Sequence, residues 1–502
     1  MSATPSDGGA SDDTDRTPVE GAEVCVVGAG PGGALLAHRL AKRGHEVVVI
    51  EAGPTFDKES RVDRMKRDIR PKDFEMDSRY GVGKDWPISY EDVRPYYAEV
   101  EQEIGVSGPD DTIHGPPREA EYPMDPYPPS YPDKLFTRAG EKLGYDVERG
   151  AYAINTGAYD RNECQGYGTC QHVCPSGAKY SADIHVEKAI SEGATVIDEA
   201  PVQRLNHGPD GEEITEAVYK TPDGETHRQT ADVFVAAAGA YETPRLLFLS
   251  ESAEHPNGLA NSSGTLGRYF MGHPPASVIG ILPGEETYPG QFGPTFSSGI
   301  AQFMDGEGER GGVNIGILND PGPSPASIAM SDVGIGDALL ETVDTQYGSA
   351  VGTFMNCEML PRAENRITLD ESTTDDNDNP VLDLQLSPGE YARKAQEKGI
   401  AVSSELVEEM GGNVLYGEGT QTMEHDDLPP LAKGGYHPMG GTRMGEDPTE
   451  SVVDPNLRTH DLENLYVSSG GTFVTVGASN PTMTIMALSL RLADHIHEVQ
   501  AS

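Results

Sequence analysis

One histidine near the C-terminus stands in a sequence setting suited to proton transfer. His437 lies in the loop GGYHPMGGTRMG, residues 434–445, where glycines let the backbone pass close to a flat ring. An imidazole has a pKa near neutrality, so it can take a proton from an alcohol. His437 is one of 14 histidines, and an ordinary loop histidine is the alternative interpretation. The loop makes His437 a candidate base.

A second polar residue precedes the last apolar segment. The sequence GASNPTMTIMALSLRLADHI, residues 477–496, places Asn480 directly before Pro481 and a predicted helix. Asparagine followed by proline is typical of a helix N-cap and first turn, so capping is one interpretation of Asn480. The positive helix end would also stabilise negative charge on a reduced cofactor, and the Asn480 amide could contact a substrate oxygen. The two roles are compatible.

Glycines near the N-terminus are spaced for binding a dinucleotide. Gly28, Gly30 and Gly33 form G-x-G-x-x-G between a predicted strand and helix, and Glu51 ends the next strand, 18 residues after Gly33. This spacing permits a tight turn, close approach of a pyrophosphate and close helix packing, and Glu51 would accept hydrogen bonds from ribose hydroxyls. The pattern alone does not separate FAD from NAD. The predicted contacts here are Gly28, Ala29, Gly30, Pro31, Gly32, Gly33, Glu51 and Ala52.

Three cysteines lie close together in the sequence. Cys164, Cys170 and Cys174 form the pattern C-x5-C-x3-C-P. Thiolates on a short loop suit an iron–sulfur cluster, and we take these three residues as its predicted ligands. Reduced structural thiols, or a zinc ion held by the trio together with His172, are the alternatives. A disulfide is disfavoured in a reducing cytoplasm.

The intervening sequence predicts the elements that position these groups. Ser89 is a good cap for a surface helix, and residues 107–133 are dense in proline and predict an extended connection. Residues 194–237 alternate as strands. From 275 to 430 short strands are separated by Gly, Pro and Asp, with a helix near 389–410, which predicts a separate sheet domain.

Composition limits the function class. The 502 residues include 82 acidic and 37 basic side chains, a net charge of -45 that would repel nucleic acid and anionic lipid. The acidic residues are spread along the chain, which favours a solvated surface and suggests adaptation to high salt. No apolar run is long enough to span a membrane, and the polar first twenty residues favour a cytoplasmic protein, although export with a signal-bearing partner stays open.

Taken together, the chain resembles the glucose–methanol–choline (GMC) oxidoreductases, most closely their sugar and gluconate dehydrogenase branch. The similarity is carried in order by VVGAGPGG with Glu51, YGVGKDWPISYEDVRPYYAEVE, AAAGAYETPRLLFLS, NSSGTLGRYFMGHP, and HPMGGTRMG through NLYV to SNPTMTIMALSLRLADHI. The resemblance implies an α/β fold, with a Rossmann-like FAD-binding domain and a second, α+β substrate domain built on an antiparallel sheet.

The resemblance also implies roles for individual residues. His437 falls on the family's base, which takes the hydroxyl proton while hydride passes to flavin N5, and Asn480 falls on its second His-or-Asn position. Some relatives carry a three-iron [3Fe-4S] cluster on a matching cysteine trio. Further FAD contacts carried over are Val202, Ala238, Gly239, Ser469, Gly470, Pro481 and Thr482.

Three features depart from the family pattern, and the first two bear on cofactor binding. Between Gly53 and Arg70 only about sixteen residues stand where the family has a longer stretch that seats the flavin ring. Ser469 replaces a usual aspartate near the pyrophosphate, and Glu251 replaces a glycine. A shortened flavin seat favours a second hypothesis, a non-catalytic or flavin-poor binding or assembly subunit.

The leading hypothesis is a dehydrogenase that takes hydride from a sugar or related alcohol and passes electrons to an acceptor other than oxygen, through an electron-accepting or small accessory subunit. An NAD-linked dehydrogenase is a further alternative. We expect neither nucleic acid nor direct membrane insertion. The expected organisation is a disordered tail (1–20), an FAD-binding domain (21–274, with the cysteine loop at 161–180), a substrate domain (275–430) and a C-terminal return to the FAD-binding domain (431–502).

Overall fold

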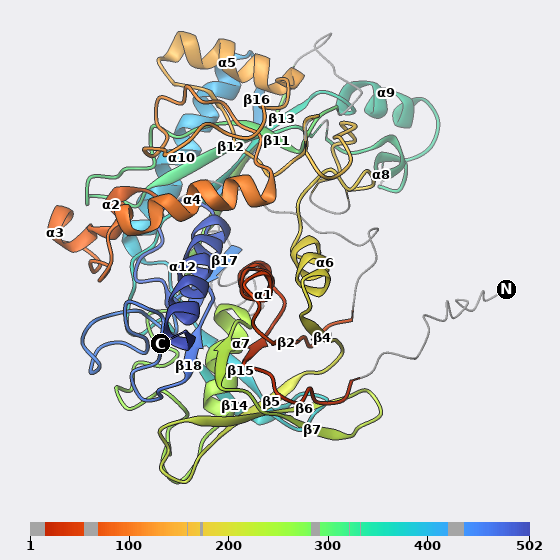
Figure 1. The fold of residues 1–502 in the computed structure, drawn as a ribbon. Coiled ribbons are helices and arrows are strands. Elements are labelled where there is room, and N and C mark those ends of the chain that lie inside the picture. Colours follow the sequence, from red (N-terminus) through yellow and green to blue (C-terminus); the bar gives the residue numbers. More distant parts are fainter. Residues whose placement is uncertain are drawn as a thin grey trace.

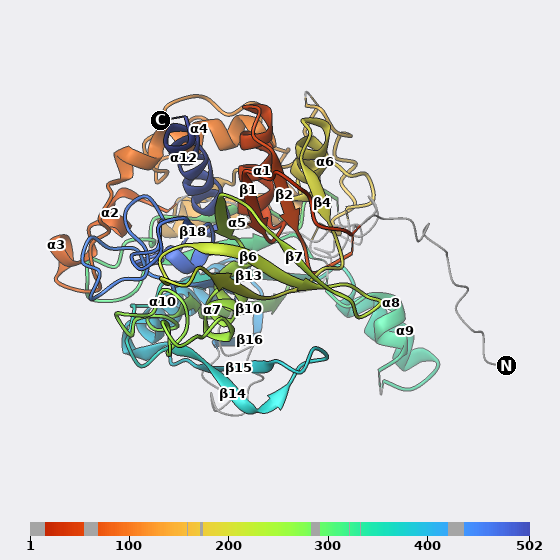
Figure 2. The ribbon, with the colours of Figure 1, turned by 60° about the horizontal axis from the view of Figure 1, so that its bottom comes forward.

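A parallel sheet and an antiparallel sheet organise the chain (Figures 1 and 2). The computed structural model describes residues 16–54, 69–157, 159–170, 174–282, 292–320, 322–331, 333–419 and 436–501. Most of the segment between Gly53 and Arg70, together with His172, lies outside these ranges, so the expectations for both are outside the described structure.

The parallel sheet has the strand order β18-β8-β1-β2-β4. Its strands are β1 (Val24–Val27), β2 (Val47–Ile50), β4 (Thr195–Ile197), β8 (Val233–Ala236) and β18 (Leu465–Val467). Every residue of β1 and β2 is buried, as expected for strands covered on both faces. Val24 is in register with Val47 on one side and Val233 on the other, so β1 runs through the centre.

Four helices pack side by side beside this sheet. They are α1 (Pro31–Lys42), α4 (Tyr90–Ile104), α6 (Asp183–Ser191) and α12 (Thr482–Gln500). Helix α1 contacts α6 and α12, and α12 contacts α4 (Figure 1). Proline at the first position of α1 has the φ angle that a helix start needs and lacks only an N–H that would be unpaired there. The chain therefore brings its C-terminal helix against its N-terminal dinucleotide motif.

The second sheet has the order β16-β10-β13-β12-β11-β3. Its strands are β3 (Glu148–Arg149), β10 (Pro275–Ile281), β11 (Phe296–Ile300), β12 (Val313–Leu318), β13 (Ala350–Cys357) and β16 (Asn413–Gly419). Helices α10 (Gly389–Glu409) and α5 (Tyr131–Leu143) supply apolar side chains to a core shared with one face. Alternate residues, including Asn314 and Asn356, belong to the opposite face.

Smaller elements complete the fold. They are α2 (Pro71–Phe74), α3 (Met76–Tyr80), α7 (Gly239–Leu249), α8 (Pro325–Ala329), α9 (Asp337–Gln346), the 3-10 turn η3 (Gly470–Thr472), the meander β5 (Val202–His207), β6 (Ile214–Lys220) and β7 (Thr226–Gln229), the hairpin β14 (Arg366–Thr374) and β15 (Pro380–Gln385), and the pair β9 (Met271–His273) and β17 (Tyr436–Met439). The hairpin β14–β15 packs against α7, beside the parallel sheet.

The structure confirms the expected fold class and most predicted elements. The βαβ opening, the strands of 194–237 and the helix near 389–410 are all present. The structure assigns the N-cap of α12 to Pro481 and not to the predicted Asn480, whose Oδ1 accepts a hydrogen bond from Asn356. None of the described helices combines the length and apolar content of a membrane span.

Candidate active site

A cavity of about 580 Å³ opens at the carboxyl ends of β1, β2 and β8. This volume is within the roughly 300–1,000 Å³ of cofactor sites, and the place is where doubly wound sheets bind dinucleotides. The structure brings eleven of the fifteen predicted cofactor contacts to its walls: Gly28, Gly30, Pro31, Gly32, Glu51, Ala52, Val202, Ala238, Gly239, Ser469 and Gly470. The cavity therefore joins the N-terminal motif to segments more than 400 residues away.

Two glycines of the motif have different physical reasons to be glycine. A Cβ on Gly33 would overlap the Gly28 carbonyl oxygen, so this residue allows the helix to pack against the turn. No described atom lies within 4 Å of a Cβ built on Gly30, which faces the cavity. Gly30 therefore leaves room for a close-approaching group such as a pyrophosphate.

Glu51 braces the glycine turn as well as lining the cavity. Its Oε2 accepts a hydrogen bond from the Ala29 backbone N–H at 2.6 Å, and its Oε1 accepts one from Gly53 at 2.9 Å. Four of the predicted contacts do not line the cavity. One of them is Ala29, whose backbone N–H donates to Glu51. Gly33 packs behind the turn, and Pro481 and Thr482 begin α12, whose Ile485 lines the cavity.

The far wall contains residues that the sequence did not single out. Arg245 on α7 lines the cavity and is held by Asp375 at 2.6 Å, in the turn between β14 and β15. Asn377 and Asn379 from the same turn also line it. Their type and spacing are those of an ordinary polar turn, so only the docking of the hairpin against α7 reveals them.

His437 lies beside this cavity, at a bulge. Strand β17 pairs with β9, and their register shifts between Tyr436 and Met439, so two residues of β17 bulge from the ladder. His437 takes a positive φ of 66°, a rare conformation for a side-chain-bearing residue that is concentrated at functional sites. Gly470 lines the cavity, and a Cβ built on it would lie 3.0 Å from the carbonyl oxygen of Pro438, the residue after His437.

A second buried histidine, His273 on β9, contacts His437 ring to ring. The two Nδ1 atoms are 2.9 Å apart, and His273 Nε2 lies 3.0 Å from the Gly477 carbonyl oxygen. A carbonyl only accepts, so His273 Nε2 carries the proton. Burial lowers the pKa of His273 to about 4, so its ring is neutral near pH 7 and its Nδ1 is an acceptor.

This chain of hydrogen bonds determines the His437 tautomer. Because His273 Nδ1 accepts, His437 Nδ1 must donate, and a neutral His437 then has its lone pair on Nε2. A histidine protonated on Nδ1 is the form that can act as a base through Nε2. His273 was missed by sequence reasoning, although it stands in the segment MGHP that was noted for other reasons.

Asn480 has an orienting partner of its own. Asn356 on β13 donates from Nδ2 to Asn480 Oδ1 at 2.9 Å, and both side chains are buried. A carboxamide whose oxygen accepts in this way directs its NH₂ group, a donor, to the other side. Asn356 Oδ1 is buried without a described donor. The substrate-side sheet therefore contacts the second predicted catalytic residue directly.

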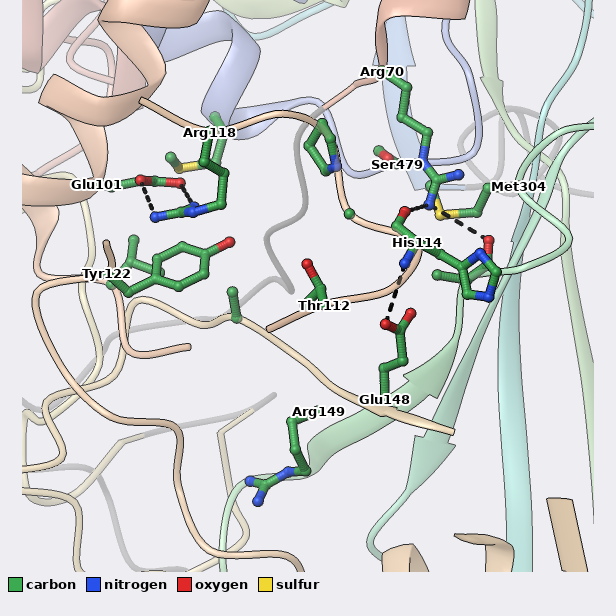
Figure 3. Close-up of a pocket in the computed structure, with 16 residues that line it drawn as sticks. Arg70, Glu101, Thr112, His114, Arg118, Tyr122, Glu148, Arg149, Met304 and Ser479 are labelled. Atoms are coloured by element: carbon green, nitrogen blue, oxygen red, sulfur yellow. Dashed lines mark hydrogen bonds and ion pairs between the residues drawn. The ribbon is translucent and has the colours of Figure 1, made fainter. Parts of the chain in front are cut away.

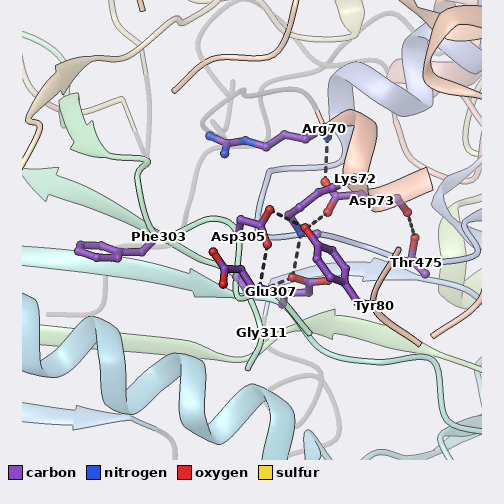
Figure 4. A network of polar contacts seen from close by, with 12 residues as sticks. Arg70, Lys72, Asp73, Tyr80, Phe303, Asp305, Glu307, Gly311 and Thr475 are labelled. Atoms are coloured by element: carbon purple, nitrogen blue, oxygen red, sulfur yellow. Dashed lines mark hydrogen bonds and ion pairs between the residues drawn. The ribbon is translucent and has the colours of Figure 1, made fainter. Parts of the chain in front are cut away.

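A buried ionic network includes Lys72 and Asp73 (Figure 4). Lys72 Nζ lies 2.6 Å from Asp73 Oδ1 and 3.3 Å from Glu358 Oε2. Burial alone would lower the pKa of Lys72, but these two carboxylates raise it above its usual range. The Asp73 carboxylate also leaves no space for a side chain at Gly477, whose carbonyl accepts from His273.

A small cavity of about 50 Å³ lies near Ser479 and Met483, on either side of the α12 start (Figure 3). The Arg118 guanidinium contacts Glu101 in its wall, with 2.8 Å between Nη2 and Oε2. Burial raises the pKa of Glu101 to about 7 despite this partner. The space holds a few water molecules and not a sugar, so it is not a substrate site by itself.

The cysteine trio gathers around one apolar cluster. Cys174 belongs to it together with Tyr152, Ile154, Ala178 and Phe296, and Cys164 and Cys170 pack against it. The trio is not among the groups of described residues whose ligand atoms lie within 4.8 Å of one another. Phe354 also packs against this cluster and lies two residues before Asn356, on the same face of β13. The role of the thiols as iron ligands stays a prediction.

Comparison with known proteins identifies similar chains. Residues 69–275 and 361–489 each match a family model described as GMC oxidoreductase, and residues 26–57 match an NAD(P)-binding Rossmann-like domain. The fructose dehydrogenase large subunit of Gluconobacter japonicus is 31% identical, over 95% of this chain and 97% of that protein. The 2-methyl-1,2-propanediol dehydrogenase of Mycolicibacterium austroafricanum is 29% identical, over 96% of both chains.

Solved structures share the fold at low identity. Pyridoxine 4-oxidase from Mesorbium loti aligns with a TM-score of 0.63 and 17% identity, covering 95% of this chain and 99% of that one. Formate oxidase aligns with a TM-score of 0.65 and 15% identity, covering 97% of this chain and 99% of that one. At this level of identity the likeness concerns the fold alone.

Proposed function

The chain belongs to the GMC oxidoreductase family, and on that premise we propose that it is an FAD-dependent dehydrogenase that oxidises a CH–OH group in a sugar or related alcohol. One observation carries the proposal. The wall of the nucleotide cavity at Gly470 touches the backbone of Pro438, so a dinucleotide in that cavity would extend toward the His437–His273 pair.

The cavity fits the adenosine and pyrophosphate part of FAD. Gly30 leaves open space next to the N-terminus of α1, and the Glu51 carboxylate lies at the wall, where ribose hydroxyls can donate to it. When bound, FAD would supply the hydride acceptor. The seat of its ring depends in part on residues 55–68, which lie outside the described ranges.

His437 is the proposed base. Its Nε2 would take the proton of the substrate hydroxyl, and its Nδ1–H would stay bonded to His273 throughout. The positive charge that develops on the His437 ring is then shared with a neutral acceptor in a buried site, which stabilises it. Asn480 would donate to the substrate oxygen, held in orientation by Asn356.

We further propose that the cysteine trio binds a [3Fe-4S] cluster that takes electrons onward. In support, Cys174 belongs to one packed cluster that Cys164 and Cys170 also contact, and Phe354, which packs against the same cluster, lies two residues before Asn356 on one face of β13. Relatives include a protein named as a large subunit, which favours an accessory or electron-accepting subunit here as well. Structural thiols or zinc with His172 are the competing assignments. Finding neither iron nor acid-labile sulfide in anaerobically purified protein would remove this part of the proposal.

The experiment that tests the main proposal is a visible absorption spectrum of protein purified in high salt, before and after anaerobic addition of sugars and alcohols. We expect a flavin band that one of them bleaches. A colourless protein that reduces NAD⁺ would favour the NAD-linked alternative. A folded protein that lacks flavin, or keeps a band that no alcohol bleaches, would favour the assembly-subunit alternative.

A further inference from the structure

Two histidines and a glutamate meet away from the active site, between three helices. They are His38 on α1, Glu103 on α4 and His185 on α6, and one ligand atom from each lies within 4.8 Å of the others. Both histidines are buried, with 6% and 0% of their surfaces exposed. The three helices neighbour one another in Figures 1 and 2. The convergence arises from tertiary packing, since the residues are far apart in sequence.

The separations are compatible with a shared ion. His185 Nδ1 lies 2.8 Å from the Tyr180 hydroxyl, which leaves Nε2 as the nitrogen toward Glu103. The distance from Nε2 to Glu103 Oε2 is 3.7 Å, longer than a hydrogen bond. Two ligands of one tetrahedral zinc stand roughly 3.3–3.5 Å apart, because each bond is about 2.0–2.2 Å. A ring nitrogen held by a second polar group is also usual for metal-binding histidine.

Charged and polar neighbours surround the group. Burial, and after it the nearby His185 ring, lower the pKa of His38 to about 4. Hydrogen bonding and attraction to the His185 ring lower the pKa of Glu103 to about 2. Lys188 is the neighbouring cation, and its Nζ is shared between Glu103 at 4.0 Å and Asp160 at 3.6 Å.

The group is reachable from outside. His38 and Glu103 line an open cavity of about 590 Å³, whose charged wall residues are Lys42, Glu103, Asp160, Arg161, Glu187, Lys188 and Glu192. Four of these are acids and three are bases, so the net charge of the wall favours a cation. The cavity leaves space for water as a fourth ligand.

We propose that His38, Glu103 and His185 bind one divalent transition-metal ion of the Zn²⁺ class, with water completing its coordination. Two imidazoles select such an ion over Mg²⁺ and Ca²⁺, which prefer oxygen. The ion would fasten α1, whose N-terminus forms the nucleotide cradle, to α4 and α6. The site is independent of the cysteine trio and of the proposed oxidation reaction.

The test measures metal stoichiometry in the intact, chelator-stripped protein. Equilibrium dialysis with Zn²⁺ should give one molar equivalent more for the unmodified protein than for His38→Gln or Glu103→Gln, whatever the cysteines bind. Zn²⁺ should raise the thermal midpoint of the unmodified protein and lose that effect in the two variants. His497→Gln is the matched control, because His497 also pairs with a histidine, His45, at 2.9 Å.

Equal Zn²⁺ binding in all four proteins would overturn the proposal, and so would equal Mg²⁺-induced and Zn²⁺-induced stabilisation. A zinc-soaked crystal of the unmodified protein provides a readout that does not depend on variant folding. Anomalous density between the three side chains is expected, and its absence overturns the site. Alcohol oxidation is not part of this readout, so failure of the proposed function would leave the result interpretable.

Discussion

At the scale of single residues, the candidate active site consists of pairs in which one member orients the other. His273 determines which nitrogen of His437 carries the proton, and Asn356 determines which face of the Asn480 amide is available. Both orienting residues are buried and lie on strands, so their positions are set by the sheets and not by mobile loops. This arrangement makes separable predictions for the base and for its partner.

Replacing His437 should strongly slow substrate oxidation while leaving flavin binding unchanged. His437→Ala removes the proton acceptor, and we expect substrate-driven bleaching of the flavin band to slow by about 10²–10⁴-fold, the usual contribution of a positioned base. The flavin content should be unchanged. Anaerobic stopped-flow absorption measures both quantities. An unchanged bleaching rate would rule out His437 as the base.

Replacing His273 should lower kcat through its effect on His437. His273→Phe removes the acceptor for His437 Nδ1–H, and we expect kcat to fall by about 10- to 100-fold, with the apparent pKa of the base displaced. His273→Gln retains an acceptor and should recover part of the loss. The pH dependence of kcat for the three proteins checks this. A loss in kcat with an unmoved pH profile would indicate a merely structural role.

The pKa of His273 also makes a stability prediction. Its folded-state pKa, about 4, lies below the unfolded value of roughly 6.5, so between these pH values the unfolded chain binds a proton that the folded chain does not. The free energy of unfolding should therefore fall as pH decreases from about 6.5 to about 4, by up to about 3 kcal/mol from this group. Urea unfolding at several pH values should show a shallower decline for His273→Gln, and an identical decline would contradict the assignment.

At the scale of elements, the nucleotide cradle depends on two contacts of the strand–turn–helix unit. Helix α1 begins immediately after the turn that follows β1. It can pack there because Gly33 has no side chain to overlap the Gly28 carbonyl oxygen. The Glu51 carboxylate at the end of β2 ties back to the turn through Ala29. The bulge in β17 places His437 beside the nucleotide cavity, near its wall residue Gly470.

Two alanine substitutions in the same turn should behave differently. Gly33→Ala would force the helix away from the Gly28 carbonyl, so we expect loss of both thermal stability and flavin. Gly30→Ala meets no described atom within 4 Å and has a negative φ of -63°, so the apoprotein should keep its thermal midpoint. Its added methyl group would face the pyrophosphate, and flavin affinity should fall. Equal effects of the two substitutions on the apoprotein midpoint would contradict this division of roles.

At the scale of the whole molecule, the net charge of -45 dominates solution behaviour. Self-repulsion among 82 acidic residues opposes the compact state at low ionic strength, and salt screens it, because the Debye length falls from about 10 Å at 0.1 M to about 3 Å at 1 M. Arg245–Asp375 and other partly buried pairs should be affected less than exposed charges.

We therefore expect the free energy of unfolding to rise with NaCl into the molar range. Urea titrations across a NaCl series, repeated with a series of neutral osmolyte, separate screening from general solute exclusion. A flat response to NaCl would show that the acidic surface is not an adaptation to salt.

The sequence alone was sufficient for the parts that depend on local pattern: the glycine turn with Glu51, the four-residue buried strands and the long helices. His437, which was expected in a loop, lies on strand β17. These patterns report backbone conformation and periodicity, which neighbouring residues decide. The residues that contact His437 and Asn480 could not be predicted in this way. His273 is 164 residues from His437, and their contact depends on the register of β9 with the bulged strand β17. Asn356 on β13 is 124 residues from Asn480. The tertiary structure also brings Asn480 into contact with Asn356 of the antiparallel sheet, and it brings His38, Glu103 and His185 together. Which side chains meet is decided by how whole elements pack.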